Sequence, residues 1–238
     1  MNLDSLKKLN VRIEFKKEKE IKQLLCFLLI MAVLKFVLYE GRDYIWNIPL
    51  YILTGKIFPY IGVIPAVVFF KLRKRKFKDL FEENVLKQIL IGVVIGFICS
   101  SIVLYILMVV RHDRVAAYNI KGVWPWIHTF LNYLLRVSLV EEFAYRVEVQ
   151  ERTEDICGKA RFVAPLISAI IFGLMHFVTG TFRQVVLSFF LGCVLGYAKL
   201  YIKKCTFVSV LFAHAVYDMM IVAVPTIKYF IELKTSMG

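Results

Sequence analysis

The sequence has few of the residues that interrupt regular structure, with 12 glycines and 6 prolines among 238 residues and no low-complexity linker. A soluble domain of this length has a smaller apolar fraction and more breaks between its apolar segments. Here 59% of the residues are hydrophobic, and the mean hydropathy is +0.68. So apolar a chain with so few breaks excludes an ordinary soluble domain.

Cysteine is also sparse, and its pattern excludes the usual cysteine-based frameworks. The five cysteines are odd in number, fall mostly inside apolar segments and lack metal-ligand spacing. We interpret them as reduced packing residues. The motif H-E-x-x-H of zinc proteases is absent too, so a metal requirement does not follow from the sequence.

Acidic residues are scarce, since 18 Asp and Glu stand against 31 Lys and Arg, for a net charge of +13. Such an excess is typical of nucleic-acid binding, but here the basic residues gather beside apolar segments. The positive-inside rule then places the N-terminus in the cytoplasm and favours membrane lipids, not nucleic acid, as partners. The two largest clusters are Lys7, Lys8, Arg12, Lys16, Lys17, Lys19 and Lys22, and Lys71, Arg73, Lys74, Arg75, Lys76 and Lys78.

Long apolar windows predict transmembrane helices, because hydrocarbon of roughly 30 Å takes about 20 helical residues to cross. We therefore expect an all-α, polytopic integral membrane protein, with a basic cytoplasmic N-terminal tail over 1–20 and a single helical membrane domain over 21–238. Three prolines in the second window, Pro49, Pro59 and Pro65, predict a kinked or broken helix there. The windows are 21–39, 48–70, 89–110, 124–142, 162–177, 185–202 and 207–227.

The charged N-terminal segment indicates whether a signal peptide is cleaved. About twenty highly charged residues precede the first apolar window, and no small-residue cleavage site follows it, so we expect no cleavable signal peptide.

Six ionisable residues lie inside the later apolar windows, in a motif-bearing core over about 124–230. Intramembrane charges are rare, and by default they face a protein interior or an aqueous cavity. A structural lock between helices is the simpler explanation for any one of them, but an accidental cluster would leave several charges buried without compensation. The six are Glu141, Glu142, Arg146, His176, His214 and Asp218.

Helical spacing sorts these residues. Residues four apart share a helix face, so His214 and Asp218 project together, and Glu142 is positioned to pair with Arg146. Glu141 is rotated by about 100° from Glu142 and lies over Tyr145. We therefore expect one carboxylate held by Arg146 and a second one available for chemistry or metal binding.

Depth adds a further expectation. Glu141 and His176 reach the same level if antiparallel helices meet near residue 156 and if the first of them continues through "RVEVQER" beyond the hydrocarbon. That continuation is predicted to place Glu148, Glu151 and Arg152 in a wet cytoplasmic part.

Three short motifs follow one another on the late helices: "EEFAYR" fits E-E-x-x-x-R, "FGLMH" fits F-x-x-x-H and "HAVYD" fits H-x-x-x-(N/D). This ordered set resembles the CPBP intramembrane protease family, which includes CAAX prenyl endopeptidases type 2, abortive-infection proteins and bacteriocin-immunity proteins. The resemblance covers about residues 135–220. It implies a fold of about eight transmembrane helices with the catalytic groups in a cavity open to the cytoplasm. With the seven apolar windows, we expect seven to eight transmembrane helices and an active site among the last four.

The resemblance also implies roles for the motif residues. Glu141 would be the general base that activates water, and His176 would help to hold that water. His214 and Asp218 would stabilise the oxyanion, while Glu142, Arg146, Phe172 and Tyr145 would support the site. Asp218 departs from the asparagine of many members, and a carboxylate donates a hydrogen bond only when protonated. Its alternative roles are to orient His214 or to bind a metal.

Peptide hydrolysis requires a base for water and donors for the developing oxyanion, and the residues offer both. We therefore expect an intramembrane endopeptidase acting on a membrane-associated peptide or a prenylated protein, in the plasma membrane of a prokaryote. Three alternatives stay open. One is a zinc site at Glu141, His176, His214 and Asp218, in place of metal-free catalysis. The others are a non-catalytic immunity or scaffold protein and a proton-coupled transporter, although the chain lacks the internal repeat typical of transporters.

Overall fold

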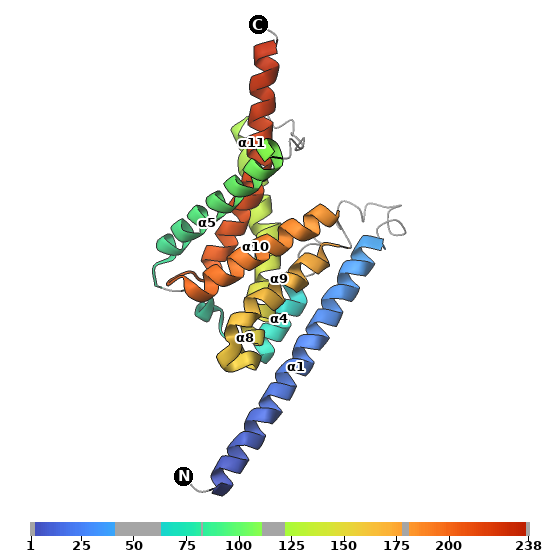
Figure 1. Cartoon of the computed structure of the whole chain (residues 1–238), viewed down its shortest axis with the longest axis vertical. Coiled ribbons are helices and arrows are strands. Elements are labelled where there is room, and N and C mark those ends of the chain that lie inside the picture. The colour runs from blue at the N-terminus through green and yellow to red at the C-terminus, as the bar shows by residue number, and fades with distance from the viewer. Residues whose placement is uncertain (1–2, 41–62, 82, 111–121, 178–180, 237–238) are drawn as a thin grey trace. The chain divides into compact units, whose positions relative to one another are not determined.

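The computed structural model describes residues 3–40, 63–81, 83–110, 122–177 and 181–236 (Figure 1). Every regular element in these ranges is helical, which confirms the predicted all-α class. The elements are α1 (Leu3–Glu40), α4 (Val63–Leu72), η1 (Phe77–Leu80), α5 (Val85–Tyr105), η2 (Ile106–Val110), α6 (Val123–Asn132), η3 (Tyr133–Ser138), α7 (Leu139–Glu142), η4 (Phe143–Gln150), α8 (Glu151–Cys157), η5 (Gly158–Val163), α9 (Ala164–Met175), α10 (Phe182–Tyr201) and α11 (Phe207–Ser236).

Four helical runs in the described ranges are long and apolar enough to cross a membrane, and a shorter apolar helix covers Val63–Leu72. Such runs support an integral membrane protein, because a helix bonds all of its own backbone groups in lipid. The four are Val85–Val110, Val123–Met175, Phe182–Tyr201 and Phe207–Ser236.

The prediction of seven to eight spans is not confirmed. The predicted window 124–142 and all but the last two residues of the window 162–177 fall within the single helical run Val123–Met175, which turns at η5. The first window lies inside the long helix α1, which begins at Leu3. Most of the window 48–70, with Pro49 and Pro59, lies outside the described residues. Pro65 stands in the first turn of α4, where its missing N–H breaks no helical bond.

The described chain forms two compact units that alternate along the sequence. Unit 1 comprises residues 1–76 and 143–200, and unit 2 comprises residues 77–142 and 201–238.

Unit 1 is built around the segment η4 to α9. The chain reverses direction between α8 and α9 (Figure 1), as expected for antiparallel helices joined near residue 156. Gly158 takes a φ of +56° at the end of α8, a conformation that glycine adopts without penalty. A proline at the start of α9 then begins the next helix. The aromatic pairs Phe27 with Phe69 and Phe70 with Phe143 pack α1, α4 and η4 together.

The helix that carries the motif acids continues as predicted, since the chain is helical from Val123 to Cys157. Its geometry was not predicted, because η3 and η4 are π-helical. A π-helix bonds each N–H to the carbonyl five residues earlier and occurs frequently at functional sites. The four-residue spacing rule therefore does not apply unchanged beyond Glu142.

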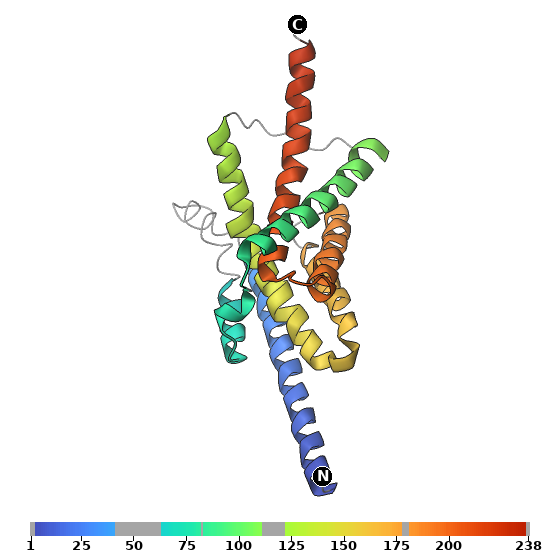
Figure 2. The ribbon, with the colours of Figure 1, turned by 90° about the vertical axis from the view of Figure 1, so that its left-hand side faces the viewer.

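Unit 2 is organised by the close packing of α5 on α11 (Figure 2). The side chain of Asn84 accepts a hydrogen bond from the backbone N–H of Lys87 and so caps α5. Gly92 and Gly96 stand one turn apart on the face of α5 that meets α11. A Cβ on Gly96 would collide with the carbonyl oxygen of Ala213, the residue before His214. The absence of a side chain therefore lets the two backbones touch.

We expect the substitution Gly96→Leu to destabilise the protein by about 1–3 kcal/mol, because the new side chain forces α5 away from α11. The measurement is the midpoint of thermal unfolding in detergent. Ser101→Leu is the matched control, since Ser101 is exposed on the same helix. Equal midpoints for the two variants would show that this close contact does not support the fold.

Candidate active site

The eight predicted site residues fall into two groups of four, one in each unit. Unit 2 holds the two motif acids on α7 and the polar pair on α11. Unit 1 holds the aromatic and basic residues of η4 together with the end of α9. The groups are Glu141, Glu142, His214 and Asp218 in unit 2, and Tyr145, Arg146, Phe172 and His176 in unit 1.

The imidazole of His214 is in contact with carboxylates at both of its ring nitrogens. Its Nδ1 atom lies 2.8 Å from Oε1 of Glu142. Its Nε2 atom lies 3.5 Å from Oδ2 of Asp218, which stands four residues further along α11. Oε2 of Glu141 lies 3.7 Å from the same Nε2 atom. Three carboxylates therefore converge on one imidazole.

Burial separates the two adjacent glutamates. The side chain of Glu142 is 0% exposed and that of His214 is 4% exposed, whereas Glu141 is 22% exposed. Asp218 resembles Glu141, with 20% of its side chain exposed. Glu142 is therefore an internal partner of His214, and Glu141 and Asp218 are the groups that solvent or a substrate can reach.

The hydrogen-bonding capacity of these groups assigns roles to the two ring nitrogens. An ionised carboxylate only accepts hydrogen bonds, so Nδ1 of His214 donates its proton to Glu142. Nε2 faces the two carboxylates of Glu141 and Asp218 at 3.7 Å and 3.5 Å. Their negative charge would stabilise a proton on Nε2, and Glu142 holds the ring in a fixed orientation.

The second group is built around the ring of Phe172 on α9. The ring centroids of Tyr145 and Phe172 lie 4.9 Å apart, and the guanidinium carbon of Arg146 lies 5.4 Å from the Phe172 centroid. The ring of His176 meets Phe172 edge to face at 4.8 Å. An aromatic face attracts a cation, so Phe172 is a common platform for Arg146 and for both neighbouring rings.

His176 stands at the C-terminal end of α9, where its Nδ1 lies 2.8 Å from the carbonyl oxygen of Phe172. A carbonyl only accepts, so Nδ1 carries the proton of the neutral ring, and the lone pair is on Nε2. This is the carbonyl bond expected of a packed histidine. It also fixes the ring, and a fixed ring with a lone pair on Nε2 is suited to accepting a hydrogen bond from water.

Arg146 is completely buried on η4 and donates to the hydroxyl of Ser168 at 3.0 Å. Ser168 in turn donates to the carbonyl oxygen of Tyr145 at 2.8 Å. The expected pair between Glu142 and Arg146 stays a prediction, since the structure joins Glu142 to His214 and Arg146 to Ser168.

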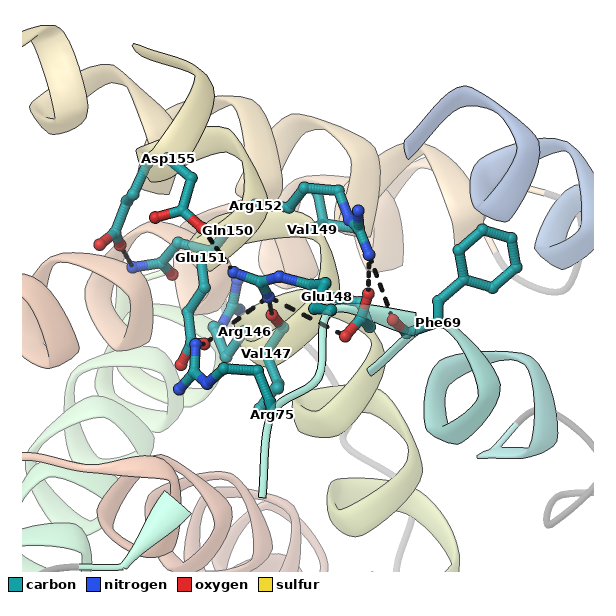
Figure 3. Close-up of polar contacts among 12 residues, drawn as sticks. Phe69, Arg75, Arg146, Val147, Glu148, Val149, Gln150, Glu151, Arg152 and Asp155 are labelled. Carbon is teal, nitrogen blue, oxygen red and sulfur yellow. Dashed lines mark hydrogen bonds and ion pairs between the residues drawn. The ribbon is translucent and has the colours of Figure 1, made fainter. Parts of the chain in front are cut away.

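The prediction that Glu148, Glu151 and Arg152 lie in a wet part is wrong for Glu148 and Arg152, whereas the side chain of Glu151 is 17% exposed. Their cytoplasmic placement stays a prediction. Glu148 and Arg152 are 0% exposed and form an ion pair at 2.9 Å (Figure 3). Arg152 also donates to Glu20 at 2.5 Å and to the carbonyl of Phe69 at 3.4 Å. The physical reason is that α1 and α4 cover this side of the helix and supply its polar partners. Such long-range partners are not visible in the local sequence.

Glu151 is the centre of a second set of contacts. Its carboxylate lies 2.6 Å from Nζ of Lys199 and 2.8 Å from a guanidinium nitrogen of Arg75. Arg73 approaches it to 3.8 Å and pairs with Asp155 at 2.8 Å. A partly buried carboxylate is stabilised by such partners, because desolvation of an isolated charge is unfavourable.

Sequence reasoning missed Ser168 and Lys199 and assigned Arg73 only to a basic cluster. Ser168 and Lys199 carried a signal, since each is a polar residue inside an apolar window. The pattern did not show which backbone or carboxylate they meet, because their partners are 22 to 53 residues away in the sequence.

A metal site receives no geometric support in the described ranges, where no group of three or more His, Cys, Asp and Glu side chains is arranged to hold a metal ion. The proposed ligands nevertheless have the chemistry that zinc accepts, namely imidazole nitrogen and carboxylate oxygen.

The fold and the site define an all-helical integral membrane protein in which the two motif acids and Asp218 surround the imidazole of His214. Residues 122–220 match the model of the family described as Type II CAAX prenyl endopeptidase Rce1-like. The matched segment contains all eight predicted site residues and supports the resemblance to the CPBP family that the three motifs carry. That family is a protease family, so the match supports a protease at the family level. No curated protein matches the chain.

The different burial of the two glutamates predicts different effects on stability. Glu142→Leu should destabilise the protein by about 1–3 kcal/mol, because it leaves the buried N–H of His214 without its acceptor. Glu141→Leu should change stability by less than about 0.5 kcal/mol, or increase it, because it removes one of three neighbouring negative charges. The measurement is the midpoint of thermal unfolding of each variant in detergent. The same loss in both variants would contradict the assigned roles.

Proposed function

We propose that this protein is an intramembrane endopeptidase in which Glu141 activates a water molecule for attack on a peptide bond. The observation that carries the proposal is the geometry around His214. A buried carboxylate, Glu142, holds the imidazole at 2.8 Å, while a partly exposed one, Glu141, lies 3.7 Å from its other nitrogen. An accessible base beside a fixed donor is the arrangement that hydrolysis of an acyl group requires.

In the proposed reaction Glu141 acts first as a base and then as an acid, while His214 stabilises the oxyanion. Glu141 takes a proton from water as the water oxygen forms a bond to the carbonyl carbon of the substrate. The negative charge that develops on the carbonyl oxygen accepts a hydrogen bond from the Nε2–H of His214. When the C–N bond breaks, the protonated Glu141 gives its proton to the leaving amine. The base is thereby regenerated, and one water is consumed for each bond cleaved.

In this scheme Asp218 acts through His214, because an ionised carboxylate cannot donate to the oxyanion. Its position 3.5 Å from Nε2 stabilises the protonated ring before substrate binds. His176 is proposed to help to hold the attacking water through its Nε2 atom. The family match implies a membrane-associated peptide as substrate, and we propose the peptide segment of a membrane-bound precursor or of a prenylated protein.

Glu141→Gln should abolish cleavage while the protein stays folded, because the amide has no basic oxygen for the water proton. We expect a decrease in kcat of about 10²- to 10⁴-fold, as for the loss of a general base. The measurement is cleavage of a fluorogenic peptide, with and without a prenyl group, by the full chain in lipid nanodiscs.

Glu232→Gln is the matched control, since Glu232 is an exposed glutamate of α11 that pairs with Lys228. Undiminished cleavage by Glu141→Gln would refute the assigned base. A wild-type protein that cleaves neither peptide would count against the protease and for the non-catalytic alternative.

The proposed mechanism needs no metal, because Glu141 supplies the base and His214 supplies the oxyanion donor. We therefore expect dialysis against EDTA to leave cleavage within about twofold of its starting rate, a change too small for the loss of a metal-bound nucleophile. Metal content of the purified protein, measured before and after dialysis, is the companion observation. Loss of activity that returns on adding Zn²⁺ would replace the metal-free mechanism with the zinc alternative.

A further inference from the structure

Three consecutive backbone carbonyls of η4 each accept a hydrogen bond from a side chain of another element. The carbonyl of Tyr145 accepts from Ser168 of α9 at 2.8 Å. The carbonyl of Arg146 accepts from Nζ of Lys199 on α10 at 3.0 Å. The carbonyl of Val147 accepts from Arg73, just after α4, at 3.1 Å. A carbonyl has two lone pairs, so these bonds add to those within the helix.

Two of the three donors are also anchored to α8. Nζ of Lys199 lies 2.6 Å from Glu151, and a second guanidinium nitrogen of Arg73 lies 2.8 Å from Asp155. Each cation therefore bridges a carbonyl of η4 and a carboxylate one or two turns later, and their side chains are only 12% and 5% exposed. Charge-assisted bonds of this kind are about twice as strong as neutral ones.

Charge neutralisation alone does not account for this arrangement. Glu151 already has Arg75 at 2.8 Å, and Glu148 has Arg152 at 2.9 Å (Figure 3). A cation present only to neutralise Glu151 would not need to reach the backbone of η4. The bonds to successive carbonyls instead act on the helix geometry, at the segment where the chain is π-helical.

The affected segment carries Tyr145 and Arg146, both packed on Phe172. That ring lies 4.8 Å from His176, whose Nδ1 bonds to the carbonyl of Phe172. A change in the register of η4 rotates Tyr145 and Arg146 away from Phe172, and the support of the Phe172 ring and of His176 changes with them.

We infer that Lys199 and Arg73 are positioning residues, which hold η4 in its π-helical register and thereby set the packing of Tyr145 and Arg146 around Phe172 and His176. Their effect on cleavage rests on the proposed function. Their effect on η4 does not, because it follows from the contacts alone.

The test is to replace Lys199 by Met and by Arg in the full chain in nanodiscs. Lys199→Met keeps the length and apolar stem of the side chain but removes both bonds, while Arg75 still compensates Glu151. Hydrogen–deuterium exchange of residues 143–150 should accelerate by about tenfold or more, while exchange of α11 stays unchanged. The kcat should fall by about tenfold at an unchanged KM. Lys199→Arg should restore most of the slow exchange and most of the kcat of the wild type.

Lys159→Met is the matched control, because Lys159 is an exposed lysine of η5 in the same unit. If Lys199→Met does not fold, Ser168→Ala tests the neighbouring carbonyl bond by the same exchange measurement and should accelerate exchange in the same segment. Exchange of η4 that matches the Lys159→Met control would overturn the inference. Accelerated exchange without any wild-type cleavage would uphold the positioning of η4 and count against the proposed function.

Discussion

A buried charge must have a partner, and this constraint governs both units of the protein. In unit 2 the buried imidazole of His214 forms a hydrogen bond with the buried carboxylate of Glu142. In unit 1 the pair of Glu148 and Arg152 is fully buried, and Glu20 extends it to α1. Breaking such a pair leaves one charge uncompensated, which is more unfavourable than the intact pair is favourable. Within each unit, helices distant in sequence are thereby held together.

The same constraint explains how two adjacent glutamates acquire different functions. Glu142 is enclosed and satisfied by His214, so it is suited to orientation. Glu141 is partly exposed beside the same imidazole, so it is suited to proton transfer. The orienting acid, Glu142, and the proposed base, Glu141, are therefore adjacent residues of one helix. The close contact of α5 with α11 at Gly96 places the helix backbone that carries His214.

The sequence predicted the features that depend on composition and local spacing. The all-α class follows from apolar windows of about 20 residues, and the pairing of His214 with Asp218 follows from four-residue spacing. The continuation of the helix past Arg146 follows from the depth at which Glu141 and His176 would meet. The family motifs "EEFAYR", "FGLMH" and "HAVYD" lie inside the segment that matches the Rce1-like model. These predictions concern contacts that a helix makes with itself or with its solvent.

The predictions that failed depend on contacts between distant segments. Arg152 was predicted to be exposed to water because its helix extends past the hydrophobic window. Its partner is Glu20, 132 residues earlier in the sequence. The acceptor role of Glu142 toward His214 was missed for the same reason, since 72 residues separate them. The π-helical geometry of η4 has no simple sequence signature, and the bonds from Ser168, Lys199 and Arg73 became visible only with the fold.

The central claim is that Glu141 and His214 act on the same chemical step. A double-mutant cycle on cleavage, with Glu141→Gln, His214→Gln and the double variant, tests it most directly. Residues that act as one unit are strongly non-additive, so the account predicts that the double variant is no slower than the slower single variant. Losses that multiply in the double variant would show that the two groups act independently, and would contradict the account.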